Sequence, residues 1–553
     1  MPATRLGWAR LGAVLVLAAL TLGVGLGRSG RLTYHEAFVA QAAREMLASG
    51  DVVTPTVGGR PWLEKPPLAI WLAALTGRAV GGVGETAART PAAVAAALLA
   101  VGVAVLGARR FGPRTGLLAG LIQVTTAWTV MRGRLAEADI LLACLVTWTL
   151  VAFDRLRDGR SAPDDSDHRG LEEETPATRM VAAWRVKIVT ALTALRDSFN
   201  PAGLWRWGFF TGLGLTALAK GVGFGAVLVL AAVLAVLAWD GDRATLRRLR
   251  FAPGWALAAL LALAWPLLAV ARHPAALRLW ALHVTDRLTT HPEYFAGQTA
   301  WQYGLGLLVA LLPWVPLGLL GAWRSLPWAL SRHGRGGGDR LLFAWALAPL
   351  AVLMLATVRN AHYAIHTLPP WSIWAALGLT RLAYRWQARG WTPARIRIAT
   401  WGAFPALGLA CALGFAWLGP RLDRRGVEWA FYESAARQLH PGEPVNLLYH
   451  VPEWDRDPYE TPFGPFPHDW AVRLFYLNHP ASCRFGLDQL TQEPGRASAL
   501  AVIGRAGDEA ELGRLGRVET LARGPSVRSD RTYFLFRVTP TPVAVLPSGN
   551  LRR

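Results

Sequence analysis

Long apolar runs separated by short polar segments dominate the chain up to about residue 418. Runs of roughly 16–22 residues can cross a bilayer as helices, and the pattern predicts about eleven of them. We expect them at 11–26, 91–108, 115–130, 138–154, 204–219, 222–239, 254–271, 301–322, 341–357, 362–380 and 399–418. A shorter apolar helix at 68–80 is expected to be half-embedded. The pattern therefore predicts an all-α polytopic membrane domain over 1–418.

The pattern changes after Gly419, where apolar runs become short and alternate with polar residues. A helical period covers 427–439, and period-2 runs at 445–450, 499–505 and 532–538 indicate strands. This predicts a small soluble α/β domain over 419–553.

Composition supports a membrane protein, because 53% of the 553 residues are hydrophobic and only 17% are charged. The net charge is +21, and every short loop assigned to the cytoplasmic side carries arginines. Such loops face the cytoplasm, so the charge indicates orientation and gives no reason to expect nucleic acid as a partner. It predicts a multi-pass protein of the cell (inner) membrane with a cytoplasmic N-terminus, a cytoplasmic loop at 155–203 and an extracytoplasmic domain at 419–553.

Chemistry-bearing residues collect on the predicted outer side, above all in the first extracytoplasmic loop, 31–90. Ionisable groups among membrane spans are costly and are therefore functional candidates. Acids offer a base or a metal ligand, and cations bind phosphate. The outer side thus indicates a site for a phosphate and a hydroxyl, drawn from His35, Glu36, Glu64, Lys65, Arg134, Glu137, Asp139, Lys220, His283, Asp286, Arg287, Arg359, Asn360, His362 and Tyr363.

Several motifs in one order resemble the lipid-dependent GT-C glycosyltransferases, which include the aminoarabinose transferases of lipid A and the protein O-mannosyltransferases. They are HEAFVAQAAREMLASGDVVTP, GGRPWLEKPPLAIWLAAL, GRLAEADILLA, TALAKGVGF and VRNAHYAIHTLPP. The resemblance implies the GT-C fold and an inverting transfer of a sugar from a polyprenyl-phosphate donor. The acceptor would be an envelope lipid, glycan or protein on the extracytoplasmic face, and no cofactor would be required.

The resemblance also assigns roles. It implies that Lys65 and Arg287 bind the donor phosphate and that Asp139 lies beside the acceptor. Glu36 matches the second acid of the family's Asp-Glu pair, and His35 stands where the family has its Asp. A third phosphate-binding cation, Arg359, replaces a family lysine. Further cavity residues would be Glu64, Arg134, Lys220 and Tyr363, and a structural divalent metal would use His283 and Glu64.

Structural readings of the same residues stay open. Thr33 and Glu36 form a capping-box pattern, Lys65 could be an interfacial anchor, and Asp139 fits a helix start. Lys220-Gly221 also fits a tight turn, and His283 an interfacial histidine.

Two rival functions remain at this point. A transporter or flippase for lipid-linked sugars would also need a basic outer cavity, and His35 in place of an acid fits an inactive relative that only binds lipid. If the chain is an enzyme, its base is either His35 or one of the carboxylates Glu36 and Asp139.

Overall fold

The computed structural model describes residues 7–28, 30–158, 201–289, 298–332, 337–356, 358–423, 425–449, 459–467, 469–491, 499–525 and 532–540. Contacts divide the chain into two compact units. The first unit comprises Met1–Val24, Leu63–Ala69 and Arg89–Ala412, and the second comprises Gly25–Trp62, Ile70–Ala88 and Leu413–Arg553. The predicted loop at 155–203 lies outside the described residues from 159 to 200.

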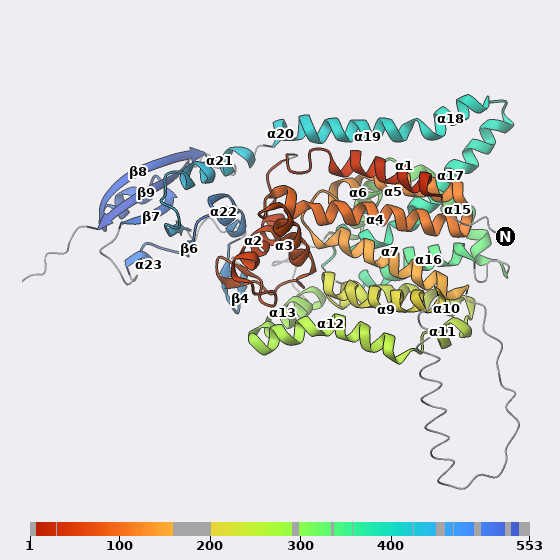
Figure 1. Cartoon of the computed structure of the whole chain (residues 1–553), viewed down its shortest axis with the longest axis horizontal. Helices are drawn as coiled ribbons and strands as arrows, with labels where there is room; N and C mark the ends of the chain where they lie inside the picture. The colour runs from red at the N-terminus through yellow and green to blue at the C-terminus, as the bar shows by residue number, and fades with distance from the viewer. Residues whose placement is uncertain are drawn as a thin grey trace, which may run out of the picture. The chain divides into compact units, whose positions relative to one another are not determined.

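Helices build the first unit (Figure 1). They are α1 (Trp8–Ala18), α4 (Glu85–Phe111), α5 (Pro113–Thr125), α6 (Ala127–Arg132), α7 (Ala138–Arg157), α9 (Pro201–Lys220), α10 (Leu228–Asp240), α11 (Arg243–Arg248), α12 (Ala252–Arg272), α13 (Ala275–Thr289), α14 (Ala300–Ala310), α15 (Val315–Leu330), α16 (Gly338–Leu353), α17 (Pro369–Ala388), α18 (Pro393–Trp401) and α19 (Ala403–Leu413). Short π or 3-10 turns occur at Ala19–Gly23, Gly223–Val227 and, as η4, at Ala361–Thr367.

Small residues allow close helix packing in this unit. A Cβ on Gly321 of α15 would lie 1.8 Å from the carbonyl oxygen of Trp374, and one on Gly378 of α17 would lie 2.3 Å from that of Leu317. The backbones of α15 and α17 therefore touch directly, as small residues permit in membrane helices.

Four described helices are long and apolar enough to cross a membrane: Glu85–Phe111, Gly223–Asp240, Ala252–Arg272 and Pro393–Leu422. A fifth crossing is possible if the bent pair α14 and α15, which meet at 100°, forms one broken span. The expected eleven spans therefore stay a prediction. Several predicted spans are interrupted: 115–130 breaks at Thr126, and 301–322 breaks after Ala310.

Buried ion pairs fasten one end of the bundle. Arg109 and Arg110 of α4 both bind Asp154 of α7, and Arg157 and Arg340 both bind Asp240 of α10. The Asp154 and Asp240 side chains are 0% and 1% exposed. Removing a single partner would leave a buried charge uncompensated, so these pairs hold α4, α7, α10 and α16 in register.

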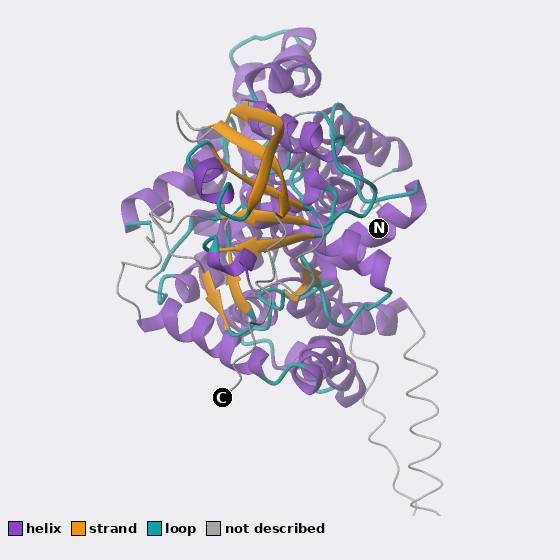
Figure 2. Ribbon diagram, turned by 90° about the vertical axis from the view of Figure 1, so that its left-hand side faces the viewer, coloured by secondary structure: helices purple, strands orange, loops and turns teal. Residues whose placement is uncertain are grey.

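The second unit contains all the described strands (Figure 2). Its five-stranded sheet has the order β6-β3-β7-β9-β8, in which β3 is parallel to β6 and β7, and β9 is antiparallel to β7 and β8. The strands are β3 (Val445–Leu448), β6 (Ala481–Arg484), β7 (Leu500–Arg505), β8 (Gly516–Pro525) and β9 (Thr532–Pro540). The predicted strands at 445–450, 499–505 and 532–538 are confirmed as β3, β7 and β9. Two hairpins, β1–β2 (Thr56–Val57, Arg60–Pro61) and β4–β5 (Tyr459–Thr461, Gly464–Phe466), complete the strands.

The remaining helices of this unit are α2 (Tyr34–Ser49), α3 (Leu68–Val80), α20 (Gly419–Leu422), α21 (Arg425–Ala436), α22 (Trp470–Leu477), α23 (Asp488–Thr491) and α24 (Asp508–Leu512), with a π turn at Gly414–Leu418. The predicted helices at 68–80 and 427–439 are confirmed as α3 and α21.

Contacts distant in sequence join the early and late segments of the second unit. Leu32 N–H donates to Tyr476 Oη at 2.8 Å, Arg31 pairs with Glu433 at 2.7 Å, and Arg44 Nη1 donates to the carbonyl of Phe475 at 2.8 Å. Residues 25–62 are therefore an integral part of the α/β unit, which the sequence pattern had placed entirely after residue 419.

Candidate active site

An ion pair between two helix ends is the centre of the candidate site in the first unit. Asp139 lies in the first turn of α7, and Lys220 is the last residue of α9. Lys220 Nζ donates to Asp139 Oδ1, and the two side chains are 14% and 11% exposed. Acids at helix starts and cations at helix ends are also favoured by the helix dipole. Gly221, with φ of 87°, closes the turn after Lys220. Lys220 therefore both precedes a tight turn and forms the ion pair.

Aromatic side chains and an imidazole surround this pair. Lys220 Nζ lies 5.1 Å from the ring centre of Tyr363 and 5.6 Å from that of Phe224, within the range of cation–π contacts. The rings of His362 and Tyr363, both on η4, lie 4.4 Å apart. We name Asp139, Lys220, His362, Tyr363 and Phe224 the Asp139 cluster.

A second pair lies next to the Asp139 cluster. Arg132, at the end of α6, binds Glu137 just before α7. Burial raises the pKa of Glu137, and the positive charges of Arg132 and Lys65 act in the opposite direction. The charge of Lys65 also acts on His362.

The turn that holds Glu64 and Lys65 is tied to α13. Trp280 Nε1 of α13 donates to the carbonyl of Leu63 at 2.7 Å. Glu64 and Lys65 are both partly buried. α13 also carries His283 and Arg287, although the side chain of Arg287 lies outside the described residues. The contact is consistent with a joint role for this turn and α13.

For Arg359 and the proposed metal ligands, the described contacts do not involve the Asp139 cluster. Arg359 Nε donates to the carbonyl of Ala356 at 2.9 Å, and its own carbonyl accepts the N–H of Gln298 at 2.7 Å. Within the described ranges, no group of three or more His, Cys, Asp or Glu residues could hold a metal ion. A metal at His283 and Glu64 therefore stays a prediction.

Arg134 performs a structural task. Its guanidinium is 3% exposed and donates to the carbonyls of Thr21, Leu22 and Val24 at 3.2, 2.9 and 2.8 Å. These carbonyls end the first apolar helix and its π turn, where the last carbonyls lack helical donors. Arg134 thus closes the end of that helix.

Replacing Arg134 by alanine should therefore destabilise the protein, by on the order of 3 kcal/mol of unfolding free energy, because several buried acceptors lose a charged donor. Thermal unfolding in detergent measures the loss. Arg114→Ala on α5, which removes an exposed arginine, is the matched control. Equal melting temperatures for the two variants would contradict the structural role.

Glu36 and His35 lie in the second unit, on α2. Thr33 Oγ1 accepts the N–H of Glu36 at 3.3 Å, and Glu36 Oε2 accepts the N–H of Thr33 at 2.9 Å. The capping-box reading is confirmed. Glu36 is 0% exposed, whereas His35 is exposed, because adjacent helical residues point in different directions.

Capping and catalysis by Glu36 can be separated with two substitutions. Glutamine preserves the capping box, so Glu36→Gln should keep the melting temperature, and Glu36→Ala should lower stability by about 1 kcal/mol. A catalytic Glu36 predicts that the glutamine variant is folded but inactive. Full turnover by Glu36→Gln would restrict the residue to capping.

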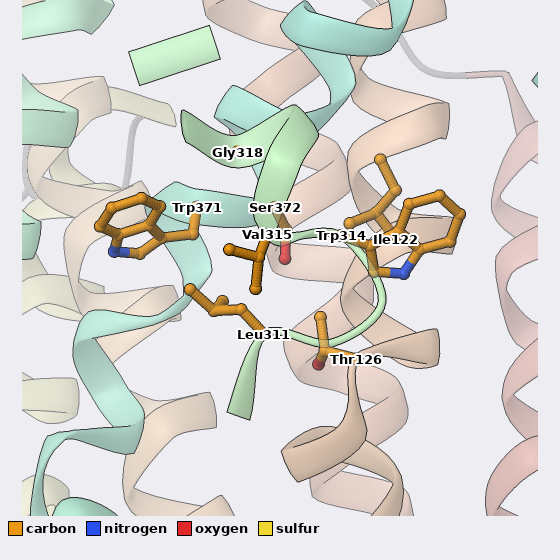
Figure 3. A pocket seen from close by; sticks show the side chains of 8 residues that line it. All are labelled: Ile122, Thr126, Leu311, Trp314, Val315, Gly318, Trp371 and Ser372. Atoms are coloured by element: carbon orange, nitrogen blue, oxygen red, sulfur yellow. The ribbon is translucent and has the colours of Figure 1, made fainter. Parts of the chain in front are cut away.

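Two pockets of the first unit lie away from this chemistry. The pocket in Figure 3, where side chains of α15, α17 and the α5–α6 break converge, has no room for a water molecule. Its Ser372 already donates to Gln123 at 2.8 Å. A groove of about 560 Å³ beside α19 is lined by proline, alanine, leucine and tryptophan side chains only. Neither pocket contains a residue of the Asp139 cluster.

Sequence reasoning named Asp139, Lys220 and Tyr363 as site candidates but did not predict which residues they contact. His362 was recognised as an outer polar residue but given no role. Its position directly before Tyr363, in VRNAHY, was the available signal. Arg132 and Phe224 were missed because an arginine near a helix end and a phenylalanine in an apolar run look ordinary.

Comparison with known proteins finds similar sequences. The family model described as dolichyl-phosphate-mannose-protein mannosyltransferase matches residues 64–161, which contain Lys65, Glu137 and Asp139. An undecaprenyl phosphate-alpha-4-amino-4-deoxy-L-arabinose arabinosyl transferase of Edwardsiella ictaluri is 29% identical over 68% of this chain and 60% of its own length. One from Pseudomonas aeruginosa is 28% identical over 65% of this chain and 57% of its own length. The chain thus spans about three fifths of these relatives.

Solved structures show the same fold. ArnT from Cupriavidus metallidurans, bound to undecaprenyl phosphate, superposes with a TM-score of 0.67 over 96% of this chain and 97% of its own, at 18% identity. The oligosaccharyltransferase AglB from Archaeoglobus fulgidus gives 0.51 over 86% and 64%, at 12% identity. The chain is therefore similar to the arabinosyl transferases in sequence and to ArnT in fold, which confirms the resemblance to lipid-dependent GT-C glycosyltransferases.

Proposed function

We propose that this protein is a membrane glycosyltransferase that moves a sugar from a polyprenyl-phosphate donor to a lipid, glycan or protein acceptor, with inversion at the anomeric carbon. One observation carries the proposal. The segment that matches the mannosyltransferase family model, 64–161, contains Lys65 and Asp139, and the Asp139 carboxylate pairs with Lys220. An ion pair, a cation for phosphate and an imidazole suit a reaction that releases a phosphate and deprotonates a hydroxyl.

The roles follow the chemistry of each side chain. Lys65, Arg287 and Arg359 are proposed to bind the donor phosphate, while His35, Glu36 and Asp139 are the acid–base candidates. Glu64, Lys220 and Tyr363 would shape the cavity. No cofactor is required in this scheme, and a divalent metal at His283 and Glu64 would serve structure.

The proposed location is the inner membrane, with about eleven spans, a cytoplasmic N-terminus and the segment 419–553 outside. In a cysteine-free variant, a cysteine at exposed His440 should react with an impermeant maleimide in spheroplasts, and one at exposed Arg114 should not. The reverse labelling pattern would refute this orientation.

Transferase activity can be tested directly. Purified protein is incubated with a radiolabelled polyprenyl-phosphate sugar and an envelope extract that contains candidate acceptors. A transferase releases polyprenyl phosphate and labels an acceptor. A flippase or an inactive lipid-binding relative does neither, so absence of both products would overturn the proposal.

A further inference from the structure

We propose that His362 is the general base that takes the proton from the acceptor hydroxyl, and that Asp139 stabilises the charged imidazole formed in this step. The inference rests on the proposed glycosyl transfer and assigns a catalytic residue that sequence reasoning left without a role.

The position of His362 suits a catalytic group. It lies on η4 between Asn360, the N-cap, and Tyr363, whose ring is 4.4 Å away. The residue is only partly buried, so a substrate can approach it. Among the residues that the structure describes, none forms a hydrogen bond with either ring nitrogen. By contrast, His366 on the same turn is 0% exposed and out of reach of any substrate.

Charged side chains surround the imidazole of His362. The groups that face His362 are Asp139 of α7, Lys220 of α9, Arg132 of α6, and Lys65 of the turn before α3. Asp139 is the carboxylate among these groups, and it can offset the positive charge of a protonated ring. A neutral ring is the form that a general base needs.

The other acid–base candidates are less suited to this step. Asp139 already accepts a hydrogen bond from Lys220, which occupies one of its carboxylate oxygens. Glu36 is fully buried and holds the start of α2. His35 is exposed on α2 of the second unit. Asp139, in contrast, can stabilise an imidazolium at His362.

The proposed step balances. The acceptor oxygen forms a bond to the anomeric carbon while its proton moves to a ring nitrogen of His362. The bond between the anomeric carbon and the phosphate oxygen breaks, and polyprenyl phosphate leaves with the electron pair. The imidazolium then returns its proton to solvent or to the released phosphate.

The test is kcat/KM against pH for wild type, His362→Gln and His362→Asn, with a defined polyprenyl-phosphate sugar. Wild-type activity should fall as the pH drops and His362 becomes protonated. Both variants should lose about 10²-fold or more, the scale of general-base catalysis, and should lack that acid limb. His440→Gln, which changes an exposed histidine of the second unit, is the matched control and should behave as wild type. Melting temperatures identify a variant that fails to fold. Two replacements of different size are used so that the test does not depend on the folding of a single variant.

The outcomes separate the two proposals. If wild-type protein transfers no sugar, the proposed function fails. If wild type is active and the folded His362 variants keep the acid limb, His362 is not the base. Loss of that limb in His35→Gln or Asp139→Asn, with His362→Gln unchanged, would likewise overturn the inference and assign the base to the other residue.

Discussion

Replacing Lys65 by alanine should lower turnover by about 10²–10³-fold, the scale for losing one preorganised electrostatic donor. The leaving phosphate gains charge as the glycosidic bond breaks, so a fixed ammonium group stabilises the transition state more than the ground state. Lys65 is partly buried and its charge reaches both Glu137 and His362. Single-turnover rates with a labelled donor measure the effect separately from donor binding.

Companion variants distinguish chemistry from anchoring. Lys65→Met keeps the aliphatic stem and should be nearly as slow as Lys65→Ala, whereas Lys65→Arg should recover part of the rate. Arg78→Ala removes an exposed cation of α3 and should leave the rate unchanged. Wild-type turnover by Lys65→Met would mean that the residue only anchors its turn at the interface.

Breaking the Asp139–Lys220 pair should cause both a stability and an activity defect. Removing one partner of a buried pair costs about 3–5 kcal/mol, because the other charge stays buried and uncompensated. Each side chain here keeps some exposure, so we expect the lower end of that range for Asp139→Asn and for Lys220→Met. Both variants should also lose turnover, since each changes the charges around His362.

The double variant Asp139→Asn/Lys220→Met provides the decisive comparison. Its stability should be closer to that of wild type than either single variant, because no lone charge remains, while its activity should stay low. Chemical unfolding in detergent gives the coupling energy of this cycle. Additive losses of stability would show that the two side chains do not interact in the folded protein.

Local patterns predicted individual elements well. The apolar run 68–80 is α3, and the alternating run 532–538 belongs to β9, because each pattern depends on neighbours close in sequence. The breaks at Thr126 and after Ala310 were not predicted, since hydropathy averages over a whole window and does not register a change in helix direction. The link between residues 25–62 and the α/β unit depends on contacts such as Leu32 with Tyr476, for which no local pattern exists.

Contacts between residues distant in sequence could not be predicted for the candidate site either. Sequence reasoning named Asp139 and Lys220 separately, but 81 positions separate them, and only the fold makes them partners. Capping by Glu36 could be predicted because Thr33 is three residues away. The role of Arg134 could not, since its acceptors lie on a helix more than 100 positions earlier.

The discontinuous second unit also sets the order in which the chain can assemble. Leu32 cannot meet Tyr476 until 444 further residues have been synthesised, which at about 5–20 residues per second takes roughly 20–90 s. During this interval α2 and the β1–β2 hairpin wait without their final partners, while most of the first unit is already made. A ribosome that stalls after residue 412 would therefore leave a helical bundle whose first loop has no sheet to join.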